Sequence, residues 1–308
     1  MQSADGVLHT RDCSDGLLVA RKKKARSVEA RERELAELLL RGTTDHYEDP
    51  LLYDFEYVDQ RDDLEWYQAI ADERAAGRPL LELGAGSGRI SIPLAMEGHH
   101  VIGLDRMPPM LEHLRLKLVR LAQAGEPVSG RVEPLVADMT AIPLADAAVA
   151  LVIAPFNCLM HLYTWRELLQ CFREVARVLV PGGTFAFDVL LPDLEWLRWD
   201  PNERHAITHF EHPASKRKMI YSTNHEYDDA TQVCHIRIYY DVASGGRLRP
   251  RTSPEQTVHL AHRQIFPEEL RMLLDLAGFE IESHTGDFVD IPLNRDVEVQ
   301  VVVAKKTK

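Results

Sequence analysis

The residues with the clearest chemical potential form a glycine-rich stretch, Glu82-Leu83-Gly84-Ala85-Gly86-Ser87-Gly88-Arg89, at the end of an apolar run over 80–83. Glycines between a strand and a helix let the backbone turn sharply and approach a bound ligand closely. Asp105 ends the next apolar run, about 20 residues further on, where a carboxylate can bind ribose hydroxyls. Asp138 ends a third run. Because parallel strands end at one edge of a sheet, these positions predict a nucleoside cofactor site.

The surroundings of the glycines narrow the choice of nucleoside. A dinucleotide fingerprint requires a third glycine at the position of Arg89, and the Gly-Lys-Ser/Thr of a phosphate-binding loop is missing. Glycine turns also join strands to helices without binding a ligand, so the two acids carry the prediction together with the glycines.

Apolar runs alternate with helical patterns from residue 79 onward, which predicts a parallel sheet with helices on both faces. Strands are expected at 80–83, 101–104, 135–137, 150–154 and 184–188. Helices are expected from the glycine turn to about Glu97, over 110–121, and from the capping box Thr164-x-x-Glu167 to the turn Pro181-Gly182-Gly183. Alternation in 233–242 and 257–263 predicts an inserted antiparallel sheet. A helix from Pro267 to Gly278 and strands at 279–283 and 297–304 complete the pattern.

Four regions follow from these elements. Residues 1–45 form an N-terminal extension, expected to be disordered over 1–20 and helical from Ser27 to just before Gly42. Its basic run, 21–26, is either a solvated stretch or a tail that faces phosphate or nucleic acid. The core begins with residues 46–203, which include an N-terminal lid and a helix near 62–76. The inserted sheet follows at 204–263, and residues 264–308 form the remainder of the core.

Taken together, the motifs resemble those of the class I S-adenosylmethionine-dependent methyltransferases, from about Tyr47 to Ala304. The matching segments are Glu82-x-Gly84-x-Gly86-x-Gly88, Asp105, Asp138-Met139, Ala154-Pro155-Phe156-Asn157, Leu179-x-Pro181-Gly182-Gly183 and Ala277-Gly278-Phe279. Within the family the chain is most similar to bacterial small-molecule N- or O-methyltransferases, including amino-sugar N-methyltransferases, which share Leu52-Tyr53-Asp54 and a sheet inserted after strand five. The resemblance implies an α/β, Rossmann-like, seven-stranded and mostly parallel sheet with an antiparallel last strand.

The resemblance also implies S-adenosyl-L-methionine as cofactor and a role for each matching residue. Gly84, Ala85 and Gly86 would approach its carboxypropyl and ribose parts, with Gly88 in the same motif and Glu82 and Arg89 supporting the turn. Asp105 would bind the ribose diol and Asp138 the adenine amino group. Arg106 and Met139 either flank the base or belong to the surface and core, Pro155 follows strand four, and Tyr53 closes over the methionine end.

The acceptor side is expected in the segment after strand four and in the lid. Asn157, His161 and Tyr163 are the expected substrate residues there, joined by Tyr47 from the lid. His161 titrates nearest to neutral pH in its segment and is the candidate general base, although a histidine that packs or hydrogen-bonds at the helix start fits equally. An amine acceptor must arrive neutral, whereas a hydroxyl needs a base or a local field.

No metal is expected. A group of histidines invites that interpretation, but their spacing matches no recognised ligand set, and histidines in an inserted sheet can line a polar pocket. The group comprises His205, His209, His212, His225, His235, His259 and His262.

Composition limits the partners. The chain has 308 residues, 36 Lys+Arg and 48 Asp+Glu, and its formal net charge of −12 makes a nucleic-acid substrate unlikely. The tetrapeptide of DNA and RNA amino-methyltransferases and the paired glutamates of protein-arginine enzymes are also missing. Four cysteines without a C-x-x-C pair, no apolar membrane-length window and no secretory signal predict a cytoplasmic protein.

The sequence therefore predicts a methyltransferase of EC class 2.1.1. It would move a methyl group by in-line displacement to an amine or hydroxyl of a small molecule of specialised metabolism. Two alternatives stay open: an RNA or peptide methyltransferase tethered by the basic run, and a non-catalytic cofactor-binding or scaffold protein. The inserted sheet is expected to cover the substrate or to form the contact of a homodimer.

Overall fold

The computed structural model describes residues 29–243 and 253–307, and the chain divides into two compact units, Met1–Arg41 and Gly42–Lys308. The predictions for 1–20 and 21–26 lie outside the described residues. A helix covers residues 29–44, so the prediction that it stops before Gly42 is wrong. Gly42 belongs to the second unit and lies close to Ala261 of the same unit: a Cβ at Gly42 would lie 2.4 Å from the Cβ of Ala261.

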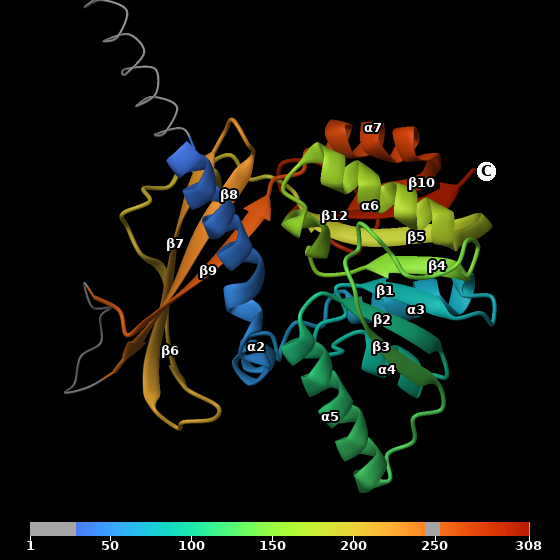
Figure 1. Ribbon diagram of the computed structural model, residues 1–308, viewed down its shortest axis with the longest axis horizontal. Coiled ribbons are helices and arrows are strands. Elements are labelled where there is room, and N and C mark those ends of the chain that lie inside the picture. The colour runs from blue at the N-terminus through green and yellow to red at the C-terminus, as the bar shows by residue number, and fades with distance from the viewer. Residues whose placement is uncertain (1–28, 244–252, 308) are drawn as a thin grey trace, which may run out of the picture. The chain divides into compact units, whose positions relative to one another are not determined.

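An eight-stranded sheet forms the centre of the second unit, in the order β11-β10-β12-β5-β4-β1-β2-β3 (Figure 1). Strands β1 to β5 pair in parallel, and β12 runs antiparallel to β5 and to β10. The strands are β1 (Leu80–Leu83), β2 (His100–Asp105), β3 (Arg131–Val136), β4 (Val149–Ala154), β5 (Leu179–Leu190), β10 (Phe279–Gly286), β11 (Ile291–Pro292) and β12 (Val299–Lys306). The Rossmann-like sheet is confirmed, with the short edge strand β11 added to the seven expected.

Strand β5 begins earlier than expected. Its segment Pro181-Gly182-Gly183 lies within the strand and not in a turn before it, and the register with β4 shifts there. Gly182 has a φ of +74°, and a Cβ on Gly183 would lie 3.0 Å from the carbonyl oxygen of Ala150. The glycines thus allow an irregularity inside a strand, which a turn signal in the sequence cannot distinguish from a true turn.

The helices are α2 (Pro50–Glu56), α3 (Leu64–Arg74), α4 (Ser91–Met96), α5 (Pro108–Ala124), α6 (Trp165–Val178) and α7 (Pro267–Ala277), with 3₁₀ turns η1 (Asp45–Tyr47), η2 (Cys158–His161) and η3 (Trp196–Arg198). The predicted capping box at Thr164 and Glu167 is confirmed. Helix α2 and the three 3₁₀ turns were not expected, because segments of three to seven residues are too short to show a hydrophobic period.

Two apolar layers cover the sheet. Alternating residues of β1 divide between them: Leu81 packs with α6 and α7, and Leu80 packs with α3. Phe172 and Leu273 belong to the first layer, and Tyr67 belongs to the second. In Figure 1, α6 and α7 lie side by side on one face of the sheet. This arrangement leaves the C-terminal ends of β1, β2 and β4 accessible to the segments that follow them.

The inserted sheet is confirmed as four antiparallel strands, β6 (His205–Glu211), β7 (Lys218–Asp228), β8 (Val233–Val242) and β9 (Gln256–Arg263), in that order. Its apolar cluster includes Ile238, Tyr240 and Leu260 and is joined by Leu52 of α2. The Tyr240 hydroxyl also donates to the carboxylate of Glu56. Helix α2 is therefore fixed against the inserted sheet.

The expected absence of a metal site has no contrary observation in 29–243 and 253–307, where no three potential ligands gather. The inserted histidines have separate surroundings: His259 contacts Asp45, and His225 bonds the carbonyl of Trp196. None of the helices in the described part of the chain is long and apolar enough to cross a membrane.

Candidate functional site

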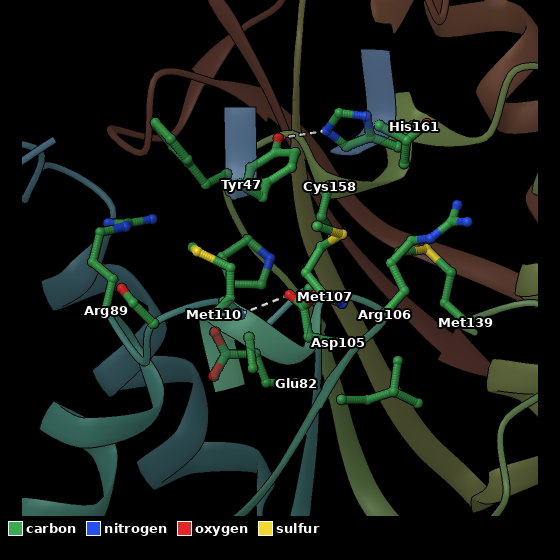
Figure 2. A pocket seen from close by; sticks show the side chains of 18 of the residues that line it. Tyr47, Glu82, Arg89, Asp105, Arg106, Met107, Met110, Met139, Cys158 and His161 are labelled. Carbon is green, nitrogen blue, oxygen red and sulfur yellow. Dashed lines mark hydrogen bonds between the residues drawn. The ribbon is translucent and has the colours of Figure 1, made fainter. Parts of the chain in front are cut away.

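A cleft with about 900 Å³ of empty space lies at the C-terminal ends of β1, β2, β3 and β4. Most of the predicted site residues line it: Tyr47, Tyr53, Glu82, Gly84, Ala85, Gly86, Arg89, Asp105, Arg106, Asp138, Met139, Pro155 and His161. In Figure 2, Tyr47 and His161 stand on one side of the cleft, with Glu82 and Asp105 across from them. The site therefore joins the two groups of residues that the sequence assigned to cofactor and acceptor.

The glycine turn leaves no room for side chains where it meets the segment after β4. A Cβ on Gly84 would lie 2.6 Å from the Cβ of Cys158, and both Gly84 and Gly86 have positive φ, +69° and +53°. Gly88 does not line the cleft; a Cβ there would meet Leu114 of α5 at 2.9 Å. Gly84 and Gly86 thus shape the ligand cradle, whereas Gly88 lets the turn pack against α5.

The carboxylate of Asp105 is fixed by the backbone at the edge of the cleft. Its Oδ2 accepts from the Gly86 N–H at 2.8 Å, and its Oδ1 accepts from the Met107 N–H at 2.7 Å. Burial raises the pKa of Asp105 above its ordinary value, although these two hydrogen bonds oppose the shift. Each oxygen keeps capacity for one more bond, which suits a pair of neighbouring hydroxyls.

Glu82 and Arg89 support the turn from two sides. Glu82 is buried, accepts from the Ser91 hydroxyl, and has its pKa raised by burial to about 8. Arg89 forms a two-pronged ion pair with Asp63, with both N–O distances 2.6 Å. Asp63, which is 1% exposed, was not anticipated from the sequence, because it precedes α3 and has no motif around it.

The third acid is less enclosed. Asp138 is exposed, and its Oδ1 accepts from both the N–H and the hydroxyl of Thr140. Its other oxygen is left for a ligand group at the rim. Arg106 and Met139 line the cleft beside it. That this part of the cleft binds adenine stays a prediction.

Helix α2 brings a group of aromatic side chains over the cleft. Tyr53 stacks near Tyr57, with 4.7 Å between ring centres, and lies 5.6 Å from the ring of Tyr47. His46 sits among the three tyrosines, and burial lowers its pKa to about 4. The rings are therefore uncharged at neutral pH and form an apolar wall.

Asp54, next to Tyr53, ties α2 to the glycine turn. Its carboxylate accepts from the Ser87 hydroxyl, from Lys117 at 3.0 Å and from His113 at 3.1 Å. Lys117 and His113 lie on α5. Because Asp54 holds three partners at once, the lid helix is fixed close to the turn, and Tyr53 with it.

His161 and Tyr47 form the polar pair of the acceptor side. The Tyr47 hydroxyl lies 2.7 Å from His161 Nε2, as Figure 2 shows, while Nδ1 is buried without a partner among the described residues. Burial and the neighbouring His262 hold the pKa of His161 well below its ordinary value. A neutral imidazole therefore faces this part of the cleft, with one N–H and one lone pair.

Two predicted substrate residues do not line the cleft. The Asn157 side chain accepts from the Leu190 N–H at 2.7 Å, so it is a structural residue of the segment after β4. The Tyr163 hydroxyl lies 2.8 Å from the hydroxyl of Thr43 and donates to the Ala261 carbonyl. Thr43, the partner of Tyr163 in this contact, does line the cleft.

Several lining residues were not assigned to the site from the sequence, although Ser87 and Phe156 lie within its motifs. Ser87, Met107, Met110, Phe156 and Cys158 line the cleft, and Met110 and Cys158 are buried. Small and apolar side chains of this kind serve cores as often as ligand sites, so only the fold identifies them.

Comparisons with known proteins agree with this site. A methyltransferase domain family model matches residues 80–183, which carry the glycine turn and the acids. A putative methyltransferase of Bacillus subtilis, YqeM, is 26% identical over 252 residues, which cover 79% of this chain and 89% of that protein. The cypemycin N-terminal methyltransferase of a Streptomyces species is 26% identical over 231 residues, covering 75% and 84%.

Solved structures share the fold. The CcbJ methyltransferase from Streptomyces caelestis has a TM-score of 0.67 at 24% identity, covering 86% of this chain and 99% of that one. The sugar N-methyltransferase KedS8 from Streptoalloteichus sp. ATCC 53650 has a TM-score of 0.56 at 21% identity, covering 82% and 92%. Together with the methyltransferase domain matched over residues 80–183 and the glycine cradle, these similarities support a class I S-adenosylmethionine-dependent methyltransferase.

Proposed function

We propose that this enzyme transfers the methyl group of S-adenosylmethionine to an amine or hydroxyl of a small molecule, and that an amine is the better fit. The observation that carries the proposal is one cleft that joins the cradle of Gly84, Gly86 and Asp105 to the neutral aromatic wall of Tyr47 and His161. The structural likeness to a sugar N-methyltransferase supports a small acceptor.

The residues present suit the cofactor. Gly84 and Gly86 would receive its methionine and ribose parts, because both line the cleft in a positive-φ conformation that residues with side chains rarely adopt. Asp105 would accept from the ribose hydroxyls, Asp138 from the adenine amino group, and Tyr53 would close over the methionine end. When bound, the cofactor supplies an activated methyl group on a sulfonium, so the protein is left with alignment and exclusion of water.

The acceptor wall favours an amine. A hydroxyl must lose its proton to a base during transfer, and His161, whose pKa is held well below the ordinary value, is a weak base. A neutral amine needs no base in the transfer step, and the cationic product can lie against the faces of Tyr47 and Tyr53. His161 and Tyr47 would then orient the acceptor through hydrogen bonds.

A peptide amine is the second candidate, because one relative is a cypemycin N-terminal methyltransferase that matches over 75% of this chain. An RNA acceptor has less support, given the net charge of −12. The match of residues 80–183 to a methyltransferase domain family disfavours a purely scaffold role. Assembly as a homodimer, a role in specialised metabolism and a cytoplasmic location remain predictions.

Two measurements test the proposal. Calorimetric titration should detect S-adenosylhomocysteine binding to the wild-type protein, and no binding would overturn the cofactor assignment. The enzyme should then be incubated with S-adenosylmethionine and matched panels of small amines, small alcohols, short peptides and RNA, with a mass gain of one methyl as readout. Methylation confined to peptides or RNA would overturn the small-molecule proposal, and methylation confined to alcohols would overturn the preference for amines.

A further inference from the structure

The turn after β4 has an unusual backbone. Phe156 and Asn157 both have positive φ, +55° and +63°. Residues other than glycine rarely adopt this conformation, because their Cβ then crowds the backbone. Such conformations persist where surrounding contacts determine them. The turn lies at the cleft, where Pro155, Phe156 and Cys158 form part of the lining.

A single buried carboxylate holds this turn. Asp188, near the end of β5, accepts at Oδ1 from the Phe156 N–H at 2.8 Å and from the Tyr67 hydroxyl at 2.7 Å. Its Oδ2 accepts from the Asn157 N–H at 3.3 Å. Asp188 is 3% exposed and does not itself line the cleft. Within the described residues, the side-chain hydrogen bonds of Asp188 thus go to the turn and to the tyrosine that supports it.

The turn then sets the position of two lining side chains. The ring of Phe156 lies beneath the Arg89 guanidinium, 4.7 Å from its centre, and against the edge of Tyr57. Cys158 donates to the Leu83 carbonyl and occupies the space that a side chain on Gly84 would need. A change in the backbone at 156 and 157 would therefore move both the cofactor cradle and the base of the aromatic wall.

We propose that Asp188 is a positioning residue of the methyl-transfer site. It fixes the turn at 155–158 in the conformation that closes the cleft between the glycine turn and helix α2. The inference rests on the proposed function only in taking this cleft as the cofactor site. Nothing in the sequence marked Asp188, because its role depends on a turn that lies about 30 residues earlier in the chain and on the parallel pairing of β4 with β5.

The variant Asp188→Asn tests this directly. An amide has one acceptor oxygen, so in either orientation at least one backbone N–H of the turn loses its partner. Residue-resolved hydrogen exchange should be at least tenfold faster at Phe156 and Asn157 and unchanged over 150–153 of β4. S-adenosylhomocysteine should bind to this variant at least fivefold more weakly. Added S-adenosylhomocysteine should also protect the Cys158 thiol less against alkylation than it does in the wild-type protein.

Tyr67→Phe is the matched control, because it removes one bond to Asp188 but keeps both bonds from Asp188 to the turn. It should lower the melting temperature without changing exchange at 156 and 157. If Asp188→Asn does not fold, the double variant with Asn157→Gly replaces it, since glycine adopts positive φ without the steric cost. This double variant should fold and bind S-adenosylhomocysteine more weakly than the single variant Asn157→Gly, which also lacks the bond to Leu190 but keeps Asp188.

The outcomes separate the two claims. Unchanged exchange and unchanged affinity in a folded Asp188→Asn protein, or equal effects of Tyr67→Phe on the turn, would overturn the positioning role. If the wild-type protein binds no S-adenosylhomocysteine, the proposed function fails, and with it the link between the turn and the cofactor.

Discussion

The hydroxyl of Tyr47 and Nε2 of His161 lie 2.7 Å apart, although one residue belongs to η1 and the other to η2, 114 positions later. The bond connects the segment before the lid helix with the segment after β4. It thereby places one hydroxyl and one neutral imidazole at the acceptor end of the cleft, within an otherwise aromatic wall.

The first prediction concerns this pair. Tyr47→Phe should keep the ring contacts and affinity for S-adenosylhomocysteine within about threefold, but lower kcat for the acceptor about tenfold, as expected for a loss of roughly 1.4 kcal/mol. His161→Gln, which keeps one donor and one acceptor, should lose less activity than His161→Phe. Steady-state kinetics measure both. Equal activity of His161→Phe and wild type would exclude an orienting role for the histidine.

The second prediction concerns the ribose end. Asp105→Ala should weaken S-adenosylhomocysteine binding by roughly 1–3 kcal/mol, because it removes the acceptors for the hydroxyls and for the Gly86 and Met107 N–H groups. Asp138→Ala, at the exposed rim, should weaken S-adenosylhomocysteine binding less than Asp105→Ala does. Calorimetric titration at one salt concentration compares the two. An Asp105→Ala affinity equal to that of wild type would refute the assignment.

The third prediction concerns pH. The pKa of Glu82 is about 8 in the folded protein, raised from 4.5 mainly by burial. Between these values the folded state holds more protons at this site than the unfolded state, so its contribution to stability falls as pH rises from 4.5 to 8. In Glu82→Gln the side chain is neutral at every pH, so its contribution to stability does not fall over this range.

The free energy of unfolding of Glu82→Gln relative to wild type should therefore increase with pH across that window. Urea denaturation at pH 5.5, 6.5, 7.5 and 8.5 measures the difference, with the exposed Glu280→Gln as control. A difference that is constant over this range, or that decreases with pH, contradicts burial of a protonated Glu82.

The fourth prediction concerns the N-terminal unit. Removal of residues 1–41 should leave S-adenosylhomocysteine affinity within threefold, since the lining residues begin at Thr43. Methylation of a small acceptor should persist, whereas binding to a macromolecule through the basic run 21–26 should fall and lose its salt dependence. A longer deletion that removes residues 1–45 should weaken S-adenosylhomocysteine binding more, because it also removes Thr43 from the cleft and the contact of Asp45 with His259.

The sequence predicted the parts of the site that depend on local signals. Glycines after a strand and acids at strand ends, such as Gly84 and Asp105, keep the same relation to their own strands in the fold. Residues whose roles depend on distant partners were missed: Asp63 through Arg89, and Asp188 through Phe156. Asn157 was assigned to the acceptor because it follows β4, but a single sequence does not show that its amide bonds Leu190.

Helix α2 has a consequence for the redesign of this enzyme. One side of this seven-residue helix is hydrogen-bonded to the glycine turn through Asp54. Its Leu52 packs in the apolar cluster of the inserted sheet, and its Glu56 accepts a hydrogen bond from Tyr240 of that sheet. If the inserted sheet covers the acceptor, as one of the predictions from the sequence has it, recognition of the acceptor and binding of the donor are coupled through this helix. A chimaera that exchanges the inserted sheet to obtain a new acceptor would have to exchange α2 with it. Otherwise we expect its affinity for the methyl donor to decrease.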